Sequence, residues 1–570
     1  MSRPVSISRA RHLVLIGLML SGFALLAGRS AQLQLLDSDF LQGQADARHL
    51  RVVQVPAHRG MITDRHGEPL AISTPVESVW ANPRELVASP GELARVAALL
   101  GTKAEQIQRL LGQRKDREFV YLRRHMAPDK AQQVIALDIP GIYLQQEYRR
   151  YYPAGEVASH LIGFTNVDDR GQEGLELAYD KWLSGEAGAK RVVKDGRRHI
   201  VENVENIRSA RPGKSLALSI DRRIQYLAYR ELKAAVQQHH AHSGSIVVLD
   251  SRSGEVLALA NQPSFNPNNR RRLTADKLRN RAMTDVFEPG STMKPFVIAA
   301  ALQSGRYVPA TRIDTSPGLF QVGTYTIHDM HDYGVLDLTG VIRKSSNVAA
   351  SKIALALDPQ DIWRGYSEAG FGVATASGFP GEVDGYLADF HRWRDIERAT
   401  LAYGYGLSVT SMQLAEAYSV FANDGYRVPV TLLRRGDDDD VHKQVVFHPT
   451  VARSVRKMME EVVKEGGTAP LAAVSGYRVA GKTGTVHKSE AGGYAKHRYV
   501  ALFAGMAPAS DPRLVVVVVV NEPSRDEHFG GQVAGPVFSR VMAGALRLLN
   551  IAPDAEPLLQ TRRPAAEGPA

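Results

Sequence analysis

A serine and a lysine three residues apart form the first group in this sequence that could do chemistry. Ser291 and Lys294 stand in the stretch FEPGSTMKPF, residues 287–296, where a Pro-Gly pair precedes an apolar run. This pattern is typical of a helix start, so the spacing predicts that the hydroxyl and the amine share one helix face. A serine hydroxyl is a poor nucleophile and needs a base within hydrogen-bond reach.

Lys294 can be that base only when its amine is neutral. A free lysine has a pKa near 10.4, so neutrality at pH 7 requires a downward shift of about three units, or about 4 kcal/mol. Burial, a neighbouring cation and the positive end of a helix dipole each lower a lysine pKa. We therefore expect Lys294 to be buried near another positive charge.

The spacing alone is weak support, because Ser454 and Lys457 repeat it in a charged helical run that a solvated helix face explains. Two further sets accompany Ser291 in order along the chain, namely Ser345-Ser346-Asn347 and Lys482-Thr483-Gly484-Thr485. The combination of the three sets, rather than any one of them, points to acyl transfer by a serine nucleophile.

Each of the two later sets has a chemical use. Ser345 can relay a proton, and Asn347, on the same side of a loop or helix end, can hold a peptide carbonyl. Lys482 supplies a second cation, Gly484 lets a ligand backbone lie along a strand edge, and the hydroxyls of Thr483 and Thr485 can bind a carboxylate. The backbone amides of Ser291 and Thr485 could form an oxyanion hole, in which each donor contributes about 3 to 4 kcal/mol.

A sheet built from distant parts of the chain must position these residues. Residues 245–261 have two apolar strands around a polar turn, and strands are also predicted at 477–485, 499–505 and 514–520. The last is apolar on both faces, which predicts a central strand. Between these parts lies a mostly helical region of more than 200 residues that carries Ser291. The predicted fold class is α+β.

The N-terminal part reads as a membrane anchor followed by a supporting domain. An apolar run at residues 13–28 follows three arginines, and it lacks a convincing cleavage site, which favours a retained anchor over a cleaved signal peptide. The basic flank predicts a cytoplasmic N-terminus. Residues 86–111 predict a helix within the supporting domain, and residues 208–214 a linker. We predict these boundaries: 1–12 cytoplasmic, 13–34 transmembrane, 45–210 supporting domain, 215–550 catalytic domain and 551–570 a disordered tail.

Composition excludes several other functions. The net charge is +10, but basic residues are scattered among acids, so a mildly basic surface beside an anionic cell wall or membrane explains it without nucleic acid. The chain has no cysteine, which rules out disulfides and thiol chemistry. It contains no phosphate-loop or metal-site motif.

The three motifs and their surroundings resemble the class B penicillin-binding proteins, and the closest similarity is to the FtsI type that cross-links peptidoglycan at the division septum. The resemblance extends from the anchor to about residue 550. It includes PAHRGMITDRHGEPLA, VVLDSRSGEVLALANQPSFNPN, FEPGSTMKPF, KSSN, TLAYGYGLSVTSMQLA, GKTGT and LFAGMAP. It implies a β-rich, elongated pedestal domain of the dimerisation type and a transpeptidase domain with an antiparallel sheet flanked by helices, as in serine β-lactamases.

The resemblance also implies roles for particular residues. Ser291 would be the acylated nucleophile and Lys294 its base, and these two residues would form the first motif. Ser345 and Asn347 would belong to the second motif. The third motif would consist of Lys482 and the three residues after it. Ser291 would attack the D-Ala-D-Ala amide of a donor stem peptide, and an acceptor amine would then resolve the acyl-enzyme. The resemblance implies no cofactor or metal, inhibition by β-lactams, location in the inner membrane with a periplasmic catalytic domain, and division-complex membrane proteins and a glycan polymerase as partners.

Aromatic residues could line the substrate groove, and Tyr499 and Phe529 are the better candidates. Tyr403, Tyr405 and His528 are weaker ones, and His528 departs from the two aromatic residues that close relatives have before the final Gly-Gly. Glu288 is expected to be a structural carboxylate rather than a catalytic one.

Other functions remain as alternatives. A β-lactamase would need a carboxylate that activates water, and no E-x-x-L-N motif is present. A bifunctional synthase would need a polymerase domain, and a penicillin-sensing receptor would need signalling helices or a protease motif. A catalytically silent division scaffold is harder to exclude, although the intact motifs disfavour it. Among enzymes, an elongation-specific class B transpeptidase is the second candidate.

Overall fold

The computed structural model describes residues 9–33, 50–194, 200–271, 273–436, 439–490, 493–524 and 527–555. The chain divides into two compact units. The first unit comprises Met1–His58, Pro75–Arg149 and Gly185–Gly213, and the second comprises Arg59–Thr74, Arg150–Ser184 and Lys214–Ala570. Within the predicted supporting domain, 45–210, the segments Arg59–Thr74 and Arg150–Ser184 thus cluster with the second unit.

The N-terminal apolar run forms helix α1 (Arg9–Ala31), all of whose residues are exposed. Among the described residues, α1 is the one helix long and apolar enough to cross a membrane, by length and composition. It begins four residues before the predicted start and ends at Ala31. The last residue of the predicted span, Gln34, lies outside the described residues.

The first unit contains a three-stranded antiparallel sheet and a small helical core. The sheet has the order β1 (Leu50–Val55), β8 (Gly188–Lys194), β9 (Ile200–Arg208). The single helix predicted over 86–111 is instead two helices, α3 (Pro90–Leu100) and α4 (Ala104–Gln113). Gly101 separates them because it ends α3 in the left-handed region, at φ 63°. The other elements here are β4 (Val120–Met126) and α5 (Pro128–Ile135), with parts of β3 (Pro69–Ala81) and β5 (Ile142–Tyr151).

Buried polar contacts explain why Arg59–Thr74 and Arg150–Ser184 belong to the second unit. Arg59 is fully buried and forms ion pairs with Glu176 and Asp180. Asp64 accepts a hydrogen bond from the backbone amide of Arg222, 3.2 Å away, at the start of α9 (Arg222–Gln238). The short elements here are β2 (Ile62–Thr63), η2 (Gly155–Val157), α6 (Ser159–Ile162), β6 (Phe164–Thr165), β7 (Gly171–Glu173), α7 (Gly174–Ala178), α8 (Asp180–Ser184) and β10 (Leu216–Ala217).

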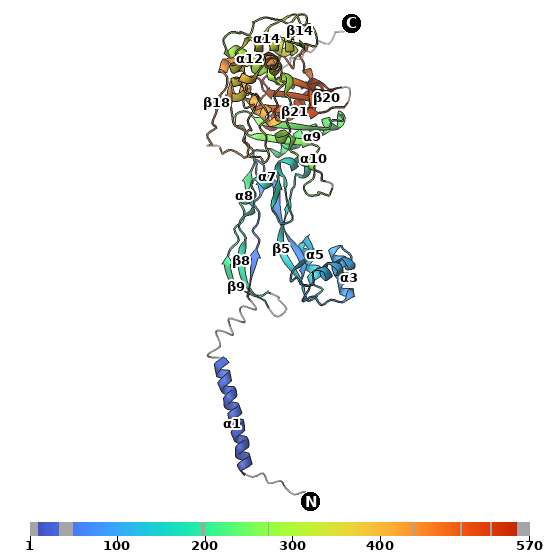
Figure 1. Cartoon of the computed structure of the whole chain (residues 1–570), viewed down its shortest axis with the longest axis vertical. Coiled ribbons are helices and arrows are strands. Elements are labelled where there is room, and N and C mark those ends of the chain that lie inside the picture. Colours follow the sequence, from blue (N-terminus) through green and yellow to red (C-terminus); the bar gives the residue numbers. More distant parts are fainter. Residues whose placement is uncertain are drawn as a thin grey trace, which may run out of the picture. The chain divides into compact units, whose positions relative to one another are not determined.

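A five-stranded antiparallel sheet is the centre of the second unit (Figure 1). Its order is β12 (Val256–Gln262), β11 (Ser243–Asp250), β21 (Leu514–Asn521), β20 (Gly493–Ala507), β19 (Ala480–Glu490). The middle strand is β21, as its apolar sequence predicted, and its residues are buried from Leu514 to Val520. The sheet thus joins strands from both ends of the domain, and the expected α+β class is confirmed.

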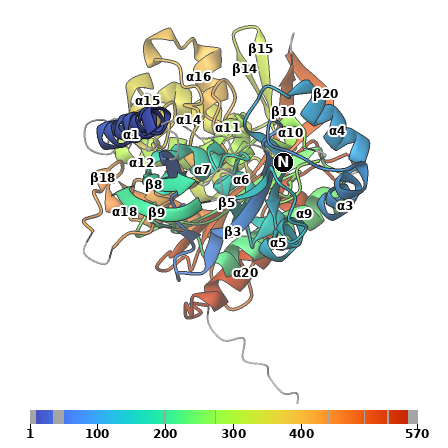
Figure 2. The same cartoon turned by 90° about the horizontal axis from the view of Figure 1, so that it is seen from below.

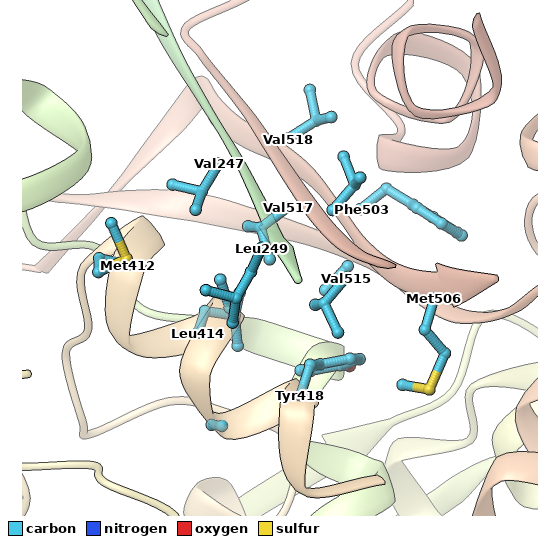
Figure 3. Packing of buried hydrophobic residues seen from close by; sticks show 14 of the residues in the cluster. Val247, Leu249, Met412, Leu414, Tyr418, Phe503, Met506, Val515, Val517 and Val518 are labelled. Atoms are coloured by element: carbon cyan, nitrogen blue, oxygen red, sulfur yellow. The ribbon is translucent and has the colours of Figure 1, made fainter. Parts of the chain in front are cut away.

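Helices cover both faces of this sheet. Contacts of two neighbouring residues on β11 show this, since successive residues of a strand point to opposite faces. Gly244 faces Leu232 and Val236 of α9, whereas the Ser245 hydroxyl lies 2.7 Å from that of Ser411 in α17 (Ser411–Ala422). Helix α20 (Gly535–Leu548) packs on the α9 side. Figure 3 shows the other interface, where Met412, Leu414 and Tyr418 of α17 meet strand residues.

The region between β12 and β19 carries the helices that build the site. Helices α12 (Lys294–Gln303), α14 (Asn347–Ala356), α15 (Pro359–Glu368) and α16 (Asp395–Leu401) gather on one side (Figure 2). The region is less uniformly helical than expected, because it includes strand pairs of two to four residues, which are too short to give a pattern. These are β13 (Ile313–Asp314) with β16 (Val335–Leu336), β14 (Leu319–Val322) with β15 (Tyr325–His328), and β17 (Tyr426–Arg427) with β18 (Gln444–Val445).

The remaining helices connect these layers. They are α10 (Ala275–Leu278), α11 (Arg281–Thr284), η3 (Gly290–Met293), α13 (Leu338–Lys344), η4 (Phe390–Arg392), α18 (Pro449–Glu460), η5 (Pro470–Ala472) and α19 (Gly530–Val533).

The start of the predicted disordered tail is ordered. The hydroxyl of Tyr477 donates to the Ile551 carbonyl at 2.6 Å, and Asp554 accepts from the Arg478 amide at 2.7 Å. The first residues of the predicted tail therefore contact the second unit. The rest of the tail lies outside the described residues.

Candidate active site

Ser291 lies in a 3-10 turn, η3, and helix α12 begins at Lys294, whereas the sequence predicted one helix over both residues. The turn depends on two glycines. Gly290 has φ +56°, and a Cβ there would lie 2.5 Å from Val486 Cγ2. A Cβ on Gly404 would lie 2.0 Å from the Gly290 carbonyl oxygen, so a neighbouring loop packs directly against this turn. The turn that carries Ser291 is thus held by close backbone contact.

Lys294 is fully buried, and its Nζ is surrounded by oxygen atoms of the first and second motifs. It lies 2.9 Å from Ser291 Oγ and 3.0 Å from Ser345 Oγ. It also donates to the Ser345 carbonyl at 2.5 Å and to Asn347 Oδ1 at 2.8 Å. A neutral amine has two N–H donors and one lone pair. If the two N–H groups of a neutral Lys294 donate to the Ser345 carbonyl and to Asn347 Oδ1, its lone pair is left to accept the proton of the Ser291 hydroxyl.

Electrostatics favour that neutral amine. Burial lowers the pKa of Lys294 well below its usual value, and the nearby positive charge of Lys482 lowers it further, while Asp329 opposes the shift. Lys482 is also fully buried, and burial lowers its pKa to about 7. Its Nζ lies 3.2 Å from Thr483 Oγ1. The pKa of Lys294 therefore depends on the charge of Lys482.

The second motif occupies the junction between α13 and α14. Ser345 ends α13 in the left-handed region, at φ 61°, which is uncommon for a residue with a side chain. Ser346 then caps α14 by accepting from the Ala349 amide at 3.0 Å. Asn347 turns its Oδ1 toward Lys294, and its Nδ2 donates to the His328 carbonyl at 3.0 Å. The Asn347 amide, expected to hold a substrate carbonyl, thus already has partners within the protein.

The third motif lies on β19, the edge strand beside η3. Thr483 Oγ1 lies 3.0 Å from Thr468 Oγ1, and Thr485 Oγ1 accepts from the Gly530 amide at 2.9 Å. Gly484 approaches the turn before the nucleophile, since a Cβ there would lie 2.9 Å from the Pro289 carbonyl oxygen. β19 is the last strand of the sheet, and Thr483 and Thr485 line the cleft beside it, a position where an extended peptide can bind.

A cleft of about 830 Å³ brings most of the predicted site residues together. Its lining includes Ser291, Ser345, Asn347, Thr483, Thr485, Tyr499, His528 and Phe529. Lys294 and Lys482 lie beneath the surface with no exposed area. Gly484 does not line the cleft.

Stacked rings form one wall of this cleft. The rings of Tyr499 and His528 have centroids 4.2 Å apart at 20°, and His528 in turn lies 4.5 Å from Phe529. The fraction of Phe529 that is exposed is 40%. His528, considered a weaker groove candidate from sequence, is therefore part of the wall.

Other candidates lie elsewhere. Tyr403 packs against the β14–β15 hairpin, and Tyr405 packs against Tyr494, so neither lines the cleft. Glu288 accepts from the Gly406 amide and from Tyr494, which fits a structural carboxylate. Ser454 bonds back to the Thr450 carbonyl on α18, as expected for a serine on a helix surface.

Sequence reasoning missed Asp329 and Thr468, which also line the cleft. Asp329 contacts the second motif from the end of β15 and Thr468 contacts the third. Nothing in their local sequence distinguishes them. Within the described ranges, no group of three or more His, Asp or Glu side chains is placed to hold a metal ion.

A buried neutral lysine beside a serine in an open cleft can support nucleophilic acyl transfer. Comparison with known families agrees with this chemistry. Residues 244–543 match the penicillin-binding protein transpeptidase domain, and residues 54–218 match the penicillin-binding protein dimerisation domain. This chain is a class B penicillin-binding protein.

Curated relatives of this penicillin-binding protein match over nearly their whole length. Peptidoglycan D,D-transpeptidase FtsI of Escherichia coli K12 is 44% identical, over 96% of this chain and 93% of the relative. Probable peptidoglycan D,D-transpeptidase PbpC of Pseudomonas aeruginosa is 43% identical, over 95% of this chain and 96% of the relative. The penicillin-binding protein is therefore a peptidoglycan D,D-transpeptidase.

Two solved structures resemble this penicillin-binding protein, one over its transpeptidase domain and one over most of its length. The transpeptidase domain of penicillin-binding protein 3 from Burkholderia pseudomallei is 47% identical, with a TM-score of 0.56, over 60% of this chain and 98% of that one. Penicillin-binding protein 3 from Mycobacterium tuberculosis, complexed with aztreonam, is 28% identical, with a TM-score of 0.69. The match covers 88% of this chain and 98% of that one. The predicted architecture of a dimerisation domain followed by a transpeptidase domain is confirmed.

Proposed function

We propose that this enzyme cross-links peptidoglycan stem peptides at the division septum through an acyl-enzyme on Ser291. The observation that carries the proposal is the 2.9 Å distance between Ser291 Oγ and Nζ of a fully buried Lys294. The match to relatives named FtsI supports the septal role.

Acylation begins when Ser291 Oγ attacks the carbonyl carbon of the amide in D-Ala-D-Ala. The hydroxyl proton passes to the lone pair of Lys294 Nζ, and the negative charge develops on the carbonyl oxygen. The amides of Ser291 and Thr485 are the proposed donors to that oxygen, and the contact between η3 and β19 supports their proximity. The C–N bond then breaks, and the nitrogen of the leaving D-Ala takes the proton.

Ser345 is the proposed relay for that proton. Its Oγ lies 3.0 Å from Lys294 Nζ and lines the cleft, so a proton can pass from the buried amine to the leaving nitrogen. In the second half-reaction an acceptor amine attacks the ester carbonyl, loses its proton along the same route, and Ser291 Oγ leaves with a proton. The two half-reactions together exchange the terminal D-Ala for the acceptor amine and regenerate Ser291, and no metal or organic cofactor is required.

The third motif and the aromatic wall are the proposed substrate-binding groups. Thr483 and Thr485 present hydroxyls on an edge strand, where an extended stem peptide can pair with β19. Lys482 beneath them supplies positive charge for a terminal carboxylate. Tyr499 and Phe529 contribute apolar area from the aromatic wall next to β19.

A β-lactam carries the same reactive amide in a ring, so we expect it to acylate Ser291 and remain attached. Opening the ring leaves the amine on the adduct, and that amine blocks the approach of an acceptor. The proposal therefore predicts a stable adduct.

The proposed location is the inner membrane, with α1 as a single-pass anchor and the catalytic domain in the periplasm. The arginines before the apolar run support a cytoplasmic N-terminus. Division-complex membrane proteins and a glycan polymerase are the proposed partners.

The chemical test uses fluorescent penicillin and intact mass on the full-length protein in detergent. We expect one stable adduct in the wild type and in Ser454→Ala, the matched serine on α18, and none in Ser291→Ala. An adduct that survives Ser291→Ala would refute the nucleophile assignment. An absent adduct in the wild type would favour the silent scaffold.

The septal role needs a test in cells. Depletion of the chain, in a strain from which any second septal transpeptidase is deleted, is expected to give filaments, because septa can no longer be cross-linked. Rounded cells would instead assign the enzyme to elongation. Complementation by wild type but not by Ser291→Ala would separate catalysis from a scaffold role.

A further inference from the structure

A carboxylate from outside the three motifs holds the second motif in place. Asp329 follows directly after β15 in the β14–β15 hairpin. Its Oδ1 accepts from the backbone amides of Asn347, at 2.5 Å, and Val348, at 3.0 Å. Its Oδ2 accepts from the Ser346 hydroxyl at 2.5 Å. Asp329 thus binds three consecutive residues at the start of α14.

These contacts complete the cap of α14. The first amides of a helix lack partners within the helix. Ser346 satisfies the Ala349 amide, and Asp329 satisfies the two amides before it. A carboxylate at this end is also favoured by the helix dipole. Because the adjacent His328 carbonyl accepts from Asn347 Nδ2, both the backbone and the side chain of Asn347 are tied to the hairpin.

The reacting lysine depends on the same segment. Three of the four oxygen atoms around Lys294 Nζ belong to Ser345 and Asn347. Ser345 adopts a left-handed conformation, which persists only where surrounding contacts hold it. Asp329 supplies such contacts immediately after Ser345. A shift in the start of α14 would move all three oxygen atoms relative to Ser291.

Asp329 also carries charge toward the lysine pair. It is the one acidic residue among the described residues that line the cleft. Its negative charge raises the pKa of Lys294, against the lowering by burial and by Lys482. The other titratable side chains lining the cleft are Tyr333, Lys344, His487, Tyr499 and His528.

We propose that Asp329 is a positioning residue of the transpeptidation, which holds Ser345 and Asn347 against Lys294 and sets the charge that this lysine senses. The proposal rests on the proposed roles of Ser291 and Lys294. Asp329 is not a catalytic residue, because both its oxygen atoms already accept hydrogen bonds from the second motif.

Two substitutions separate position from charge. Asp329→Asn is nearly isosteric and keeps an oxygen for the two amides, but it removes the negative charge. Asp329→Ala removes both the hydrogen-bonding oxygen atoms and the negative charge. Asp332 offers a matched control in the same loop, because it accepts from the Gly334 amide and the Ser316 hydroxyl but does not contact the second motif.

The experiment measures the second-order rate constant of acylation by fluorescent penicillin against pH, on the full-length protein in detergent, with thermal unfolding as a folding check. For Asp329→Ala we expect a loss of about 10- to 100-fold at the optimum, because a misplacement of about 1 Å can cost that much. Asp329→Asn should lose less, and the acidic limb of its profile should move to lower pH, since the pKa of Lys294 falls when the negative charge is removed. Asp332→Asn should match the wild type.

The outcomes separate this proposal from the proposed function. A wild-type rate in Asp329→Ala would overturn the positioning role, and an unshifted acidic limb in Asp329→Asn would overturn the role of charge. If Asp329→Ala fails to fold, the profile of Asp329→Asn alone decides, because a purely structural residue would not move a pH limb. Acylation that persists in Ser291→Ala would instead refute the proposed function.

Discussion

Nζ of Lys294 lies 2.9 Å from Ser291 Oγ, on a side chain with no solvent-exposed area. Water cannot stabilise a charge there, and a second buried lysine, Lys482, adds repulsion. Both effects favour a neutral amine. The same burial that makes Lys294 costly for folding makes it usable as a base.

Lys294→Arg tests whether neutrality matters. A guanidinium keeps the positive charge but cannot lose its proton near neutral pH. We expect the acylation rate constant to fall by about 10²- to 10⁴-fold, the usual contribution of general-base catalysis. Stopped-flow measurement with a chromogenic cephalosporin gives the rate. Lys457→Arg, on α18, is the control and should not change it, whereas an active Lys294→Arg would rule out the base role.

The pH profile of acylation should be bell-shaped. Lys294 must be neutral, so the rate falls as pH drops through its lowered pKa. Lys482 serves as a cation, and since burial lowers its pKa to about 7, the rate should also fall as pH rises through that value. Rate constants measured across pH 5 to 10, on the order of ten points, would define both limbs.

Lys482→Ala should change both limbs of that profile. The alkaline limb near pH 7 should disappear with the group that titrates there. The acidic limb should move to higher pH, because the positive charge that lowers the pKa of Lys294 is gone. An acidic limb that stays in place would show that the two lysines do not interact.

Ser345 allows backbone strain to be separated from hydroxyl chemistry. Ser345→Gly and Ser345→Ala both remove the Oγ that lies 3.0 Å from Lys294 Nζ. Glycine tolerates φ 61° better than alanine, by about 1 kcal/mol. We therefore expect the glycine variant to be the more stable by denaturant unfolding, while both acylate slowly and alike. Recovery of acylation in the glycine variant would argue against a proton relay.

Gly290→Ala should harm the nucleophile turn. Its Cβ would lie 2.5 Å from Val486 Cγ2 at a positive φ, so Ser291 must shift. We expect a loss of about 2 kcal/mol or more in the free energy of unfolding, together with slower acylation. Gly305→Ala is the control, because Gly305 has a positive φ but no atom within 4 Å of a Cβ. That variant should lose only about 1 kcal/mol and keep its acylation rate.

Elements with a regular pattern of apolar residues, and motifs with a fixed spacing, could be predicted from the sequence. The apolar run 514–520 predicted the central strand, because only a strand covered on both faces tolerates apolar residues at every position. The three motifs predicted that Ser291, Ser345, Asn347, Thr483 and Thr485 would lie together, and the structure places them around one cleft with Lys294 buried beneath it. The long helix expected over 86–111 was wrong because a helical pattern continues through Gly101, where the chain turns. The β14–β15 hairpin was missed because four-residue strands carry too little pattern.

The amino-acid sequence by itself determined which groups are available for the proposed chemistry: a serine, a lysine three residues away, a second serine, a second lysine and the strands of the sheet beside them. The tertiary structure alone decided how that chemistry is held in place. The contacts of Asp329 with Asn347, of Thr468 with Thr483 and of Gly404 with Gly290 join residues 15 to 114 positions apart. Such contacts leave no periodic pattern and no distinctive local composition in the sequence, because they arise from packing between elements. Only folding brings the paired residues together.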